Sequence, residues 1–509
     1  MGSDNFYRDT FVLTISNLTM AIIRFIFSII LSDKLGPEGV GLYGLIMPIY
    51  DLFCCLVCGG IVAAISKEVS SYHGTGSYKN MNKSVRYNFA FLLLWSIFVT
   101  VIMFISAPLI TKYVIKDPRT LYSLWILCPA IIFIALSSIL KGYFFGVMEV
   151  NTPAIIDIVE KALRLFITLS LIDLLLLKDI TTTVTATYAS FTIGEFVSFV
   201  LLYIFFKRSS KKFTEAKSKD KETENGAQLL YNSFKTAFPL AVNGFLTTAI
   251  TSASTLLIPR RLIVSGMTYN MALESIGKFS GMALTIIFFP LVIVNSMATI
   301  LVPDISQSLT KKDYKSIGIR VNEVIKMCFI LGVSIMIICF MIPDNLGLLF
   351  YKRNDLSSFI KSAAISVPFL YASSCTYGIL NGLGKQKKIL INSILTSVIE
   401  LVIMYFLMAI PKINIYGFAI GLFVSSLLGF ILNLIEINKT VKLSINLYEI
   451  LVITALSLIC IFTIKILNAT ISNDNFLIKN IILFAISFVL FFGSIFTIRK
   501  TSTNSNVYY

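Results

Sequence analysis

The chain has 509 residues, of which 56% are hydrophobic and 14% charged, and a formal net charge of +16. Soluble globular proteins are about 45–50% apolar and about 25% charged, so this composition excludes a soluble or a disordered chain. The basic excess could indicate a nucleic-acid partner, but many of the Lys and Arg residues lie in short segments between apolar runs, as in membrane proteins. We therefore expect an all-α polytopic membrane protein without a nucleic-acid partner.

Fourteen apolar runs are long enough to cross a bilayer, because a transmembrane helix needs about 20 residues. The first run contains Arg24 and has no small-residue cleavage site, so we expect a retained span rather than a signal peptide. The expected spans lie near 10–31, 39–65, 87–107, 121–142, 153–177, 183–206, 234–264, 275–301, 321–343, 360–382, 389–411, 413–437, 446–468 and 478–498.

A polar segment, Lys207 to Gln228, divides these runs into two groups. It has no apolar face, which is typical of a solvated linker. We expect a six-helix bundle over 1–206, a cytoplasmic linker over 207–230, a second six-helix bundle over 231–440, and two additional helices with a short tail over 441–509.

The distribution of positive charge predicts the orientation of the chain. Basic residues are concentrated in the linker and in the loops after the second and eighth runs, for example Lys79, Arg86 and Lys315. Cytoplasmic loops are enriched in Lys and Arg. We therefore expect a protein of the cytoplasmic membrane with both termini inside, Lys217 in the cytoplasm and Lys116 outside.

The two halves of the sequence repeat one another. Each half has an even number of spans, so both have the same topology, and we expect a pseudo-twofold axis along the membrane normal. Many transporters are built in this way, with the site where the halves meet. Identities appear at shifts of 236, 240 and 227 positions, among them Arg24 with Arg260, Glu38 with Glu274, Tyr78 with Tyr314, Gly142 with Gly382, Glu160 with Glu400, and IGEFVS from Ile193 with IGLFVS from Ile420.

Three arginines in apolar runs are candidates for lining a substrate cavity. A charge at the bilayer centre costs about 2.5–3.5 kcal/mol on insertion scales, so such residues indicate a function or a partner. Arg24 lies midway along its run, and its repeat counterpart Arg260 is followed by Arg261. Hydropathy alone would place Arg260 at a helix end, with its charge reaching the interface. Because Arg24 has apolar sequence on both sides, we instead expect Arg24 and Arg260 to face a cavity at equal depth.

Acidic residues within the runs are candidates for ion coupling or for structural pairing. In the fifth run, the i, i+4 spacing predicts the pairs Asp157–Lys161 and Glu160–Arg164, which favours a self-neutralised helix. Glu400, the counterpart of Glu160, has no basic neighbour on its own helix, so it is the stronger candidate for ion coupling.

Three further ionisable residues carry weaker signals. Asp51 in the second run and Glu195 in the sixth have no acidic counterparts in the repeat, and each could pair across the bundle. Lys141 lies near the inner end of the fourth run, where its ammonium group can reach the interface. We expect no metal site and no cofactor, because the single histidine, His73, lies in a loop and the eight cysteines lie inside apolar runs.

Several long motifs occur in both halves of the sequence. They are LGPEGVGLYGLIMPIY from Leu35, GIVAAISKEVS from Gly60, RTLYSLWILCPAIIFIALSSILKGYFFG from Arg119, LLIPRRLIVSGM from Leu256 and GMALTIIFFPLVIVNSMATILVPDIS from Gly281. With these motifs the chain resembles the stage V sporulation protein B family, and the resemblance covers roughly residues 10–440. It implies the MATE-like, fourteen-helix fold of the polysaccharide-transporter branch of the flippase superfamily, which is similar to the lipid II flippases.

The resulting hypothesis is a flippase, not an enzyme. The resemblance implies export of an undecaprenyl-diphosphate-linked oligosaccharide or peptidoglycan precursor, by alternating access, in spore cortex or cell-wall synthesis. Guanidinium groups bind phosphates with a geometry that lysine lacks, so Arg24, Arg260 and Arg261 suit an anionic headgroup. The expected partners are this lipid-linked anionic glycan precursor, membrane lipid and, where transport is coupled, H+ or Na+.

Three alternatives stay open at this point. A cation-coupled drug exporter of the same fold would favour acidic over basic cavity residues. A membrane glycan polymerase would usually need a large extracytoplasmic loop with paired acids or His, and no loop here is long enough. A scaffold without transport activity is the third alternative.

Overall fold

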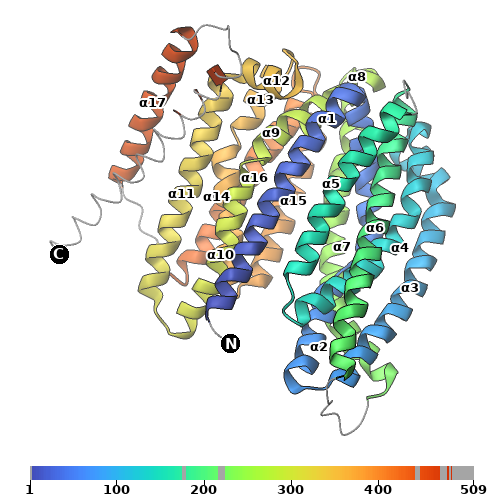
Figure 1. Ribbon diagram of the computed structural model, residues 1–509. Helices are drawn as coiled ribbons and strands as arrows, with labels where there is room; N and C mark the ends of the chain where they lie inside the picture. Colours follow the sequence, from blue (N-terminus) through green and yellow to red (C-terminus); the bar gives the residue numbers. More distant parts are fainter. Residues whose placement is uncertain are drawn as a thin grey trace. The chain divides into compact units, whose positions relative to one another are not determined.

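The computed structural model describes residues 3–174, 179–215, 224–441 and 447–470, together with 479, 480, 483 and 486. Over these residues the regular structure is helical throughout (Figure 1). The chain divides into two compact units, Met1–Arg260 and Arg261–Tyr509. Most of the expected span 478–498 and the centre of the linker, including Lys217, lie outside the described residues.

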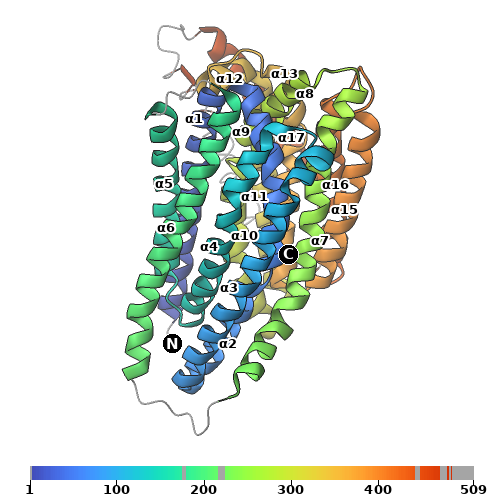
Figure 2. The ribbon, with the colours of Figure 1, turned by 90° about the vertical axis from the view of Figure 1, so that its right-hand side faces the viewer.

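The first unit is built around α4. This helix packs against α2, α3 and α6, and both views show it between α3 and α6 (Figures 1 and 2). The helices of the unit are α1 (Ser3–Cys58), α2 (Ile61–Thr75), α3 (Tyr78–Leu109), the π-helical turn η1 (Ile110–Ile115), the 3-10 turn η2 (Pro118–Thr120), α4 (Leu121–Gly146), α5 (Asn151–Leu174), α6 (Ile180–Glu215) and α7 (Gly226–Val264), whose end from Arg261 belongs to the second unit.

Two glycines mark the points where the helices of the first two expected spans are interrupted. Both spans belong to one element, α1, which turns at Gly36, where a φ of 66° is readily adopted only by glycine. The second span then passes a break at Gly60, with φ of 72°, and continues as α2 to Thr75. Its expected end at residue 65 was therefore wrong, because hydropathy marks only the apolar part of a helix that continues into polar sequence.

The second unit has α14 at its centre. α14 packs against α10, α11 and α16, and α15 packs against α16. The elements of this unit are α8 (Tyr269–Ile276), the π-helical segment η3 (Gly277–Ala283), α9 (Leu284–Phe288), α10 (Leu291–Thr310), α11 (Tyr314–Met341), α12 (Pro343–Tyr351), α13 (Ser357–Ala364), α14 (Val367–Gly382), α15 (Gln386–Leu407), α16 (Tyr416–Asn438) and α17 (Leu447–Thr470).

The same helix contacts recur in the two units. The contacts of α4 with α2, α3 and α6 are matched by those of α14 with α10, α11 and α16. A Cβ on Gly142 would lie 2.9 Å from Cβ of Ile65, and one on Gly382 would lie 3.0 Å from Cβ of Ile305. Ile65 and Gly142 thus correspond to Ile305 and Gly382, each 240 positions later in the chain. The starts of α3 and α11 are instead separated by 236 positions. Small residues allow such close approach where lipid removes the hydrophobic driving force.

The helices that could cross a membrane do not correspond one to one with the fourteen expected spans. Among the described residues, ten helices are long and apolar enough to cross a membrane, or up to eleven if α13 and α14, bent by 48°, form one broken span. Thr14–Thr75 contains two expected spans, whereas the expected span 275–301 divides before α10 at Pro290, which lacks an N–H donor. The protein is a multi-pass α-helical membrane protein, and the count of fourteen stays a prediction.

Candidate functional site

α7 makes close contacts with α1 and with the break that follows it. A Cβ on Gly59 would lie only 2.8 Å from Cα of Ala241, so the two backbones meet at this point. Eleven residues further along α7, the hydroxyl of Ser252 donates to the carbonyl oxygen of Pro48 at 2.9 Å. The space between α1 and α7 is therefore bounded by a backbone contact and by a hydrogen bond.

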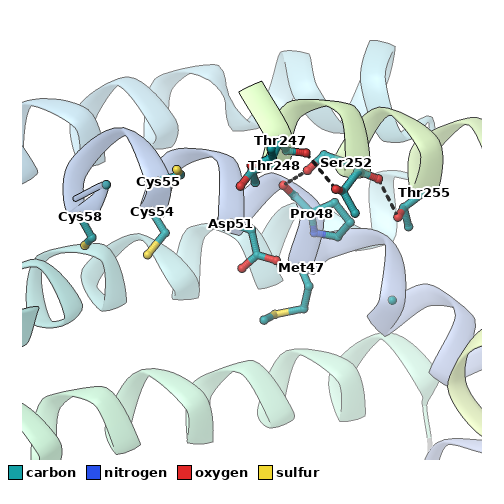
Figure 3. A pocket seen from close by; sticks show the side chains of 13 residues that line it. Met47, Pro48, Asp51, Cys54, Cys55, Cys58, Thr247, Thr248, Ser252 and Thr255 are labelled. Carbon is teal, nitrogen blue, oxygen red and sulfur yellow. Dashed lines mark hydrogen bonds between the residues drawn. The ribbon is translucent and has the colours of Figure 1, made fainter. Parts of the chain in front are cut away.

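A pocket of about 630 Å³ lies between these two helices (Figure 3). Its α1 side is formed by residues between Gly44 and Gly59, and its α7 side by residues between Thr247 and Thr255. Ligand sites in proteins commonly have volumes of about 300–1,000 Å³. The pocket is therefore large enough for a small organic group.

Asp51 is the charged side chain of this pocket. It projects from α1 between Met47 and Cys54 (Figure 3), is exposed, and has no hydrogen-bond or ion-pair partner among the described residues. α1 belongs to the candidate membrane span Thr14–Thr75, where an ionisable side chain is costly. An unpaired carboxylate that faces a pocket inside a span is a functional-site candidate.

Hydroxyl groups form the facing wall of the pocket. Thr247, Thr251 and Thr255 follow one another at i, i+4 spacing on α7, which places them on one face. Thr251 donates to the carbonyl oxygen of Thr247 at 2.9 Å, and Thr255 donates to that of Thr251 at 3.1 Å. The sequence alone does not identify this row of hydroxyls as part of a site, because Ser and Thr are common in membrane helices. Their position opposite Asp51 becomes visible only in the fold, which brings α1 and α7 together.

A second, apolar pocket adjoins the first. Its volume is about 460 Å³, and Cys55 and Gly59 line both pockets. Its other walls are aromatic and aliphatic, with Phe91 and Trp95 from α3 and Phe238 from α7. Such a surface suits hydrocarbon rather than polar groups.

A cluster of charges lies among α4, α5 and α6. Lys141 pairs with Asp157 at 2.7 Å, and Arg164 pairs with Glu160 at 2.6 Å and with Glu195 at 3.4 Å. Glu160 is buried, with 2% of its side chain exposed, so its charge depends on these cations. Together with Lys161, the cluster contains equal numbers of acidic and basic groups.

The pairing within this cluster differs in part from the sequence expectation. The pair Glu160–Arg164 forms, but Asp157 pairs with Lys141 of α4, while Lys161 contacts Glu160. The expectation that Lys141 reaches the interface was therefore wrong. Spacing along a sequence identifies partners on one helix, whereas a lysine on a neighbouring helix becomes visible only in the fold.

Glu400 has a simpler environment. It lies half-buried on α15, where its side chain packs against Gly421 on α16. Among the described residues it has no ion-pair partner, in contrast to Glu160. The structure does not bring Glu400 to the pocket that Asp51 lines.

Arg24 projects from α1 and is exposed. Within the described part of the chain, Arg24 has no ion pair or hydrogen bond with an acidic side chain or with Arg260. The expectation that Arg24 and Arg260 face one cavity at equal depth therefore stays a prediction.

The two consecutive arginines of α7 have different partners, each within its own unit. Arg260 donates through Nη2 to the backbone carbonyls of Tyr113, at 3.2 Å, and Val114, both in η1. Arg261 donates through Nε to the carbonyl oxygen of Tyr405 at 2.8 Å, and its guanidinium lies 4.0 Å from the centre of that ring. Both side chains are thus held by backbone oxygens rather than by acids.

Comparison with known proteins decides the family. The family model described as polysaccharide biosynthesis protein matches residues 6–309. The chain belongs to the polysaccharide biosynthesis protein family. A second family model, MatE, matches residues 279–406.

Two curated relatives from Bacillus subtilis (strain 168) match most of the chain. Stage V sporulation protein B is 24% identical over 462 residues, which are 91% of this chain and 89% of that protein. Lipid II flippase MurJ is 24% identical over 461 residues, which are 84% of this chain and 82% of that protein. These matches confirm the family resemblance seen in the sequence motifs.

Solved structures show the same fold. Lipid II flippase MurJ in an inward closed conformation has a TM-score of 0.71 at 15% identity and covers 96% of this chain and 100% of its own. An inward-facing multidrug resistance MATE family transporter has a TM-score of 0.63 at 15% identity and covers 84% of this chain and 98% of its own. The MATE-like architecture expected from the sequence is confirmed.

Proposed function

We propose that this protein is a flippase that moves a lipid-linked, anionic glycan or peptidoglycan precursor across the cytoplasmic membrane by alternating access, in spore cortex or cell-wall synthesis. The observation that carries the proposal is the family match over residues 6–309, together with relatives named as a sporulation protein and a lipid II flippase. The pocket between α1 and α7 supports it, because a carboxylate and a row of hydroxyl groups inside a candidate membrane span can contact a polar headgroup that would otherwise meet hydrocarbon.

The proposal assigns roles to the residues singled out in the sequence. Arg24, Arg260 and Arg261 contact the diphosphate, since guanidinium groups bind phosphate oxygens in a bidentate manner. Glu400 is the candidate for coupling to H+ or Na+, because it is an acid in a membrane helix without a cationic partner among the described residues. Glu160 has a structural role, because Lys161 and Arg164 already neutralise it.

A cation-coupled drug exporter is not better supported. The MATE transporter structure is 15% identical to this chain, so the likeness shows a shared fold and not a shared substrate. The MatE match covers residues 279–406, whereas the polysaccharide family match covers 6–309.

The proposal is tested with purified full-length protein in liposomes that contain fluorescent lipid II. We expect the protein to speed the appearance of lipid II in the opposite leaflet, measured with a membrane-impermeant quencher. A variant with Arg24→Ala and Arg260→Ala is the matched control and should be inactive. Movement no faster than in protein-free liposomes, for lipid II and for other undecaprenyl-diphosphate glycans, would overturn the proposal.

A further inference from the structure

The pocket between α1 and α7 presents hydrogen-bond acceptors. A hydroxyl group has one proton and two lone pairs. The Thr251 and Thr255 protons are already engaged by carbonyl oxygens of their own helix, and the Ser252 proton by Pro48. Their oxygens therefore offer lone pairs, and the carboxylate of Asp51 adds acceptor capacity without a proton.

This surface selects one part of an amphiphilic substrate. A diphosphate brings only acceptors and negative charge, so the carboxylate of Asp51 would repel it. Sugar hydroxyls bring donors in large number and without charge. At about 30 Å³ for each water-sized group, 630 Å³ holds on the order of 20 such groups, enough for a sugar.

The cations of the cluster among α4, α5 and α6 do not satisfy Asp51. Lys141, Lys161 and Arg164 are engaged with acids of their own cluster. Among the described residues Asp51 thus has acceptor capacity that a ligand can fill. An unpaired acid costs less when a donor from the substrate reaches it.

We infer that the pocket between α1 and α7 is the subsite for the glycan hydroxyl groups of the transported lipid, with Asp51 and the row Thr247, Thr251 and Thr255 as the accepting groups. The inference rests on the proposed function and adds an orientation to it. The glycan end of the headgroup lies at Asp51, and the diphosphate lies away from this pocket.

The test compares two lipids on the full-length protein in nanodiscs. The probes are undecaprenyl diphosphate and the same lipid carrying a disaccharide without a peptide. For Asp51→Asn we expect roughly tenfold weaker binding of the disaccharide lipid, and for Thr251→Val about threefold, with undecaprenyl diphosphate unchanged. Ser254→Ala is the matched control, because this hydroxyl on α7 donates to the Ile250 carbonyl and does not line the pocket.

The outcomes separate the inference from the proposed function. If the natural protein binds neither lipid, the inference and the proposed function are both rejected. If it binds the disaccharide lipid but both variants weaken the two lipids equally, the inference falls and the proposed function stands. Repeating the titrations in sodium chloride and in choline chloride tests a cation at Asp51. If Asp51→Asn removes a sodium dependence and leaves the preference for the disaccharide intact, the glycan subsite is excluded.

Discussion

Glu400 on α15 lies against Gly421 on α16, with its Cγ 3.4 Å from the point that a Cβ on Gly421 would occupy. Glu160 on α5 makes the equivalent contact with Gly194 on α6, where its Oε1 lies 3.0 Å from that point. These four residues are the same ones that the sequence repeat aligns. Each unit thus holds a glutamate at an equivalent helix contact with a glycine.

The surroundings of the two glutamates have diverged. The positions equivalent to those of the charged residues around Glu160 are apolar around Glu400, so the second unit keeps the acid and loses its cations. The replacements at the repeat positions are Leu401 for Lys161, Met404 for Arg164 and Leu422 for Glu195.

This divergence predicts opposite effects for two equal substitutions. Glu160→Gln leaves Arg164 and Lys161 without their buried anion and should lower the free energy of unfolding by about 2–4 kcal/mol. Glu400→Gln breaks no ion pair among the described residues and should change stability little, yet impair transport. Thermal unfolding in detergent and lipid II movement in liposomes measure the two effects. Equal, mild losses in both variants would assign both residues to packing.

The pair Lys141–Asp157 should act as a unit. Asp157→Asn leaves a lysine on α4 without its acid, whereas removing both charges together restores neutrality. In a double-mutant cycle with Lys141→Met, we expect a coupling energy of about 1–3 kcal/mol in unfolding. Transport should suffer less from Asp157→Asn than from Glu400→Gln. Additive effects of the two single changes would show that this ion pair contributes nothing.

The sequence predicts much of this fold, because its strongest signals are local. The apolar runs identify the helices, and the repeat aligns Gly142 with Gly382, which the structure shows in equivalent helix contacts. The continuation of α1 into α2 is less visible, since helical hydrogen bonds form as well in polar sequence as in apolar sequence.

The candidate site is harder to predict, because its parts are far apart in the chain. Asp51 is visible as an acid in an apolar run, but its pocket requires α7, about 200 residues later. The partner of Asp157 is likewise on another helix. Charge and spacing indicate which residues matter, and tertiary packing decides what they contact.

Asp355 should make the second unit sensitive to acid. Arg353, at 2.6 Å, and Lys278, at 2.7 Å, hold the pKa of Asp355 below its ordinary value. A carboxyl group with a lowered pKa in the folded state stabilises the fold above its unfolded pKa, and this contribution is lost as the pH falls toward the folded pKa. Stability should therefore decline from about pH 4 downward.

Asp355→Asn should flatten this decline and cost about 1 kcal/mol or less at neutral pH, since the pair is partly exposed. Thermal unfolding at a series of pH values measures both effects. Glu149→Gln, in the turn after α4, is the control that should leave the profile unchanged. An unaltered acid profile in Asp355→Asn would show that other carboxyl groups cause the decline.

The charge distribution predicts which loops a membrane-impermeant reagent reaches. Lys116, in the turn between η1 and η2, should be labelled from outside intact cells when replaced by cysteine, and Lys217 should not. The natural protein has eight cysteines of its own, so its labelling gives the background signal that is subtracted. Labelling at 217 but not at 116 would reverse the proposed orientation.

Arg260 should combine a substrate role with a structural one. Its Nη2 donates to two carbonyls of η1, whereas Arg24 has no such contact among the described residues. Arg260→Ala should therefore abolish lipid II movement and also lower the free energy of unfolding by about 1 kcal/mol, because two backbone acceptors lose a donor. Arg24→Ala should abolish movement without that loss of stability.

Lysine at position 260 distinguishes charge from geometry. Arg260→Lys keeps the positive charge but loses the planar, bidentate fork, so we expect partial recovery of movement relative to Arg260→Ala. Transport assays in liposomes, with expression and unfolding measured for each variant, check these outcomes. Full activity of the Arg24→Ala, Arg260→Ala double variant would contradict the assignment, because a diphosphate crossing the membrane needs cations that this change removes.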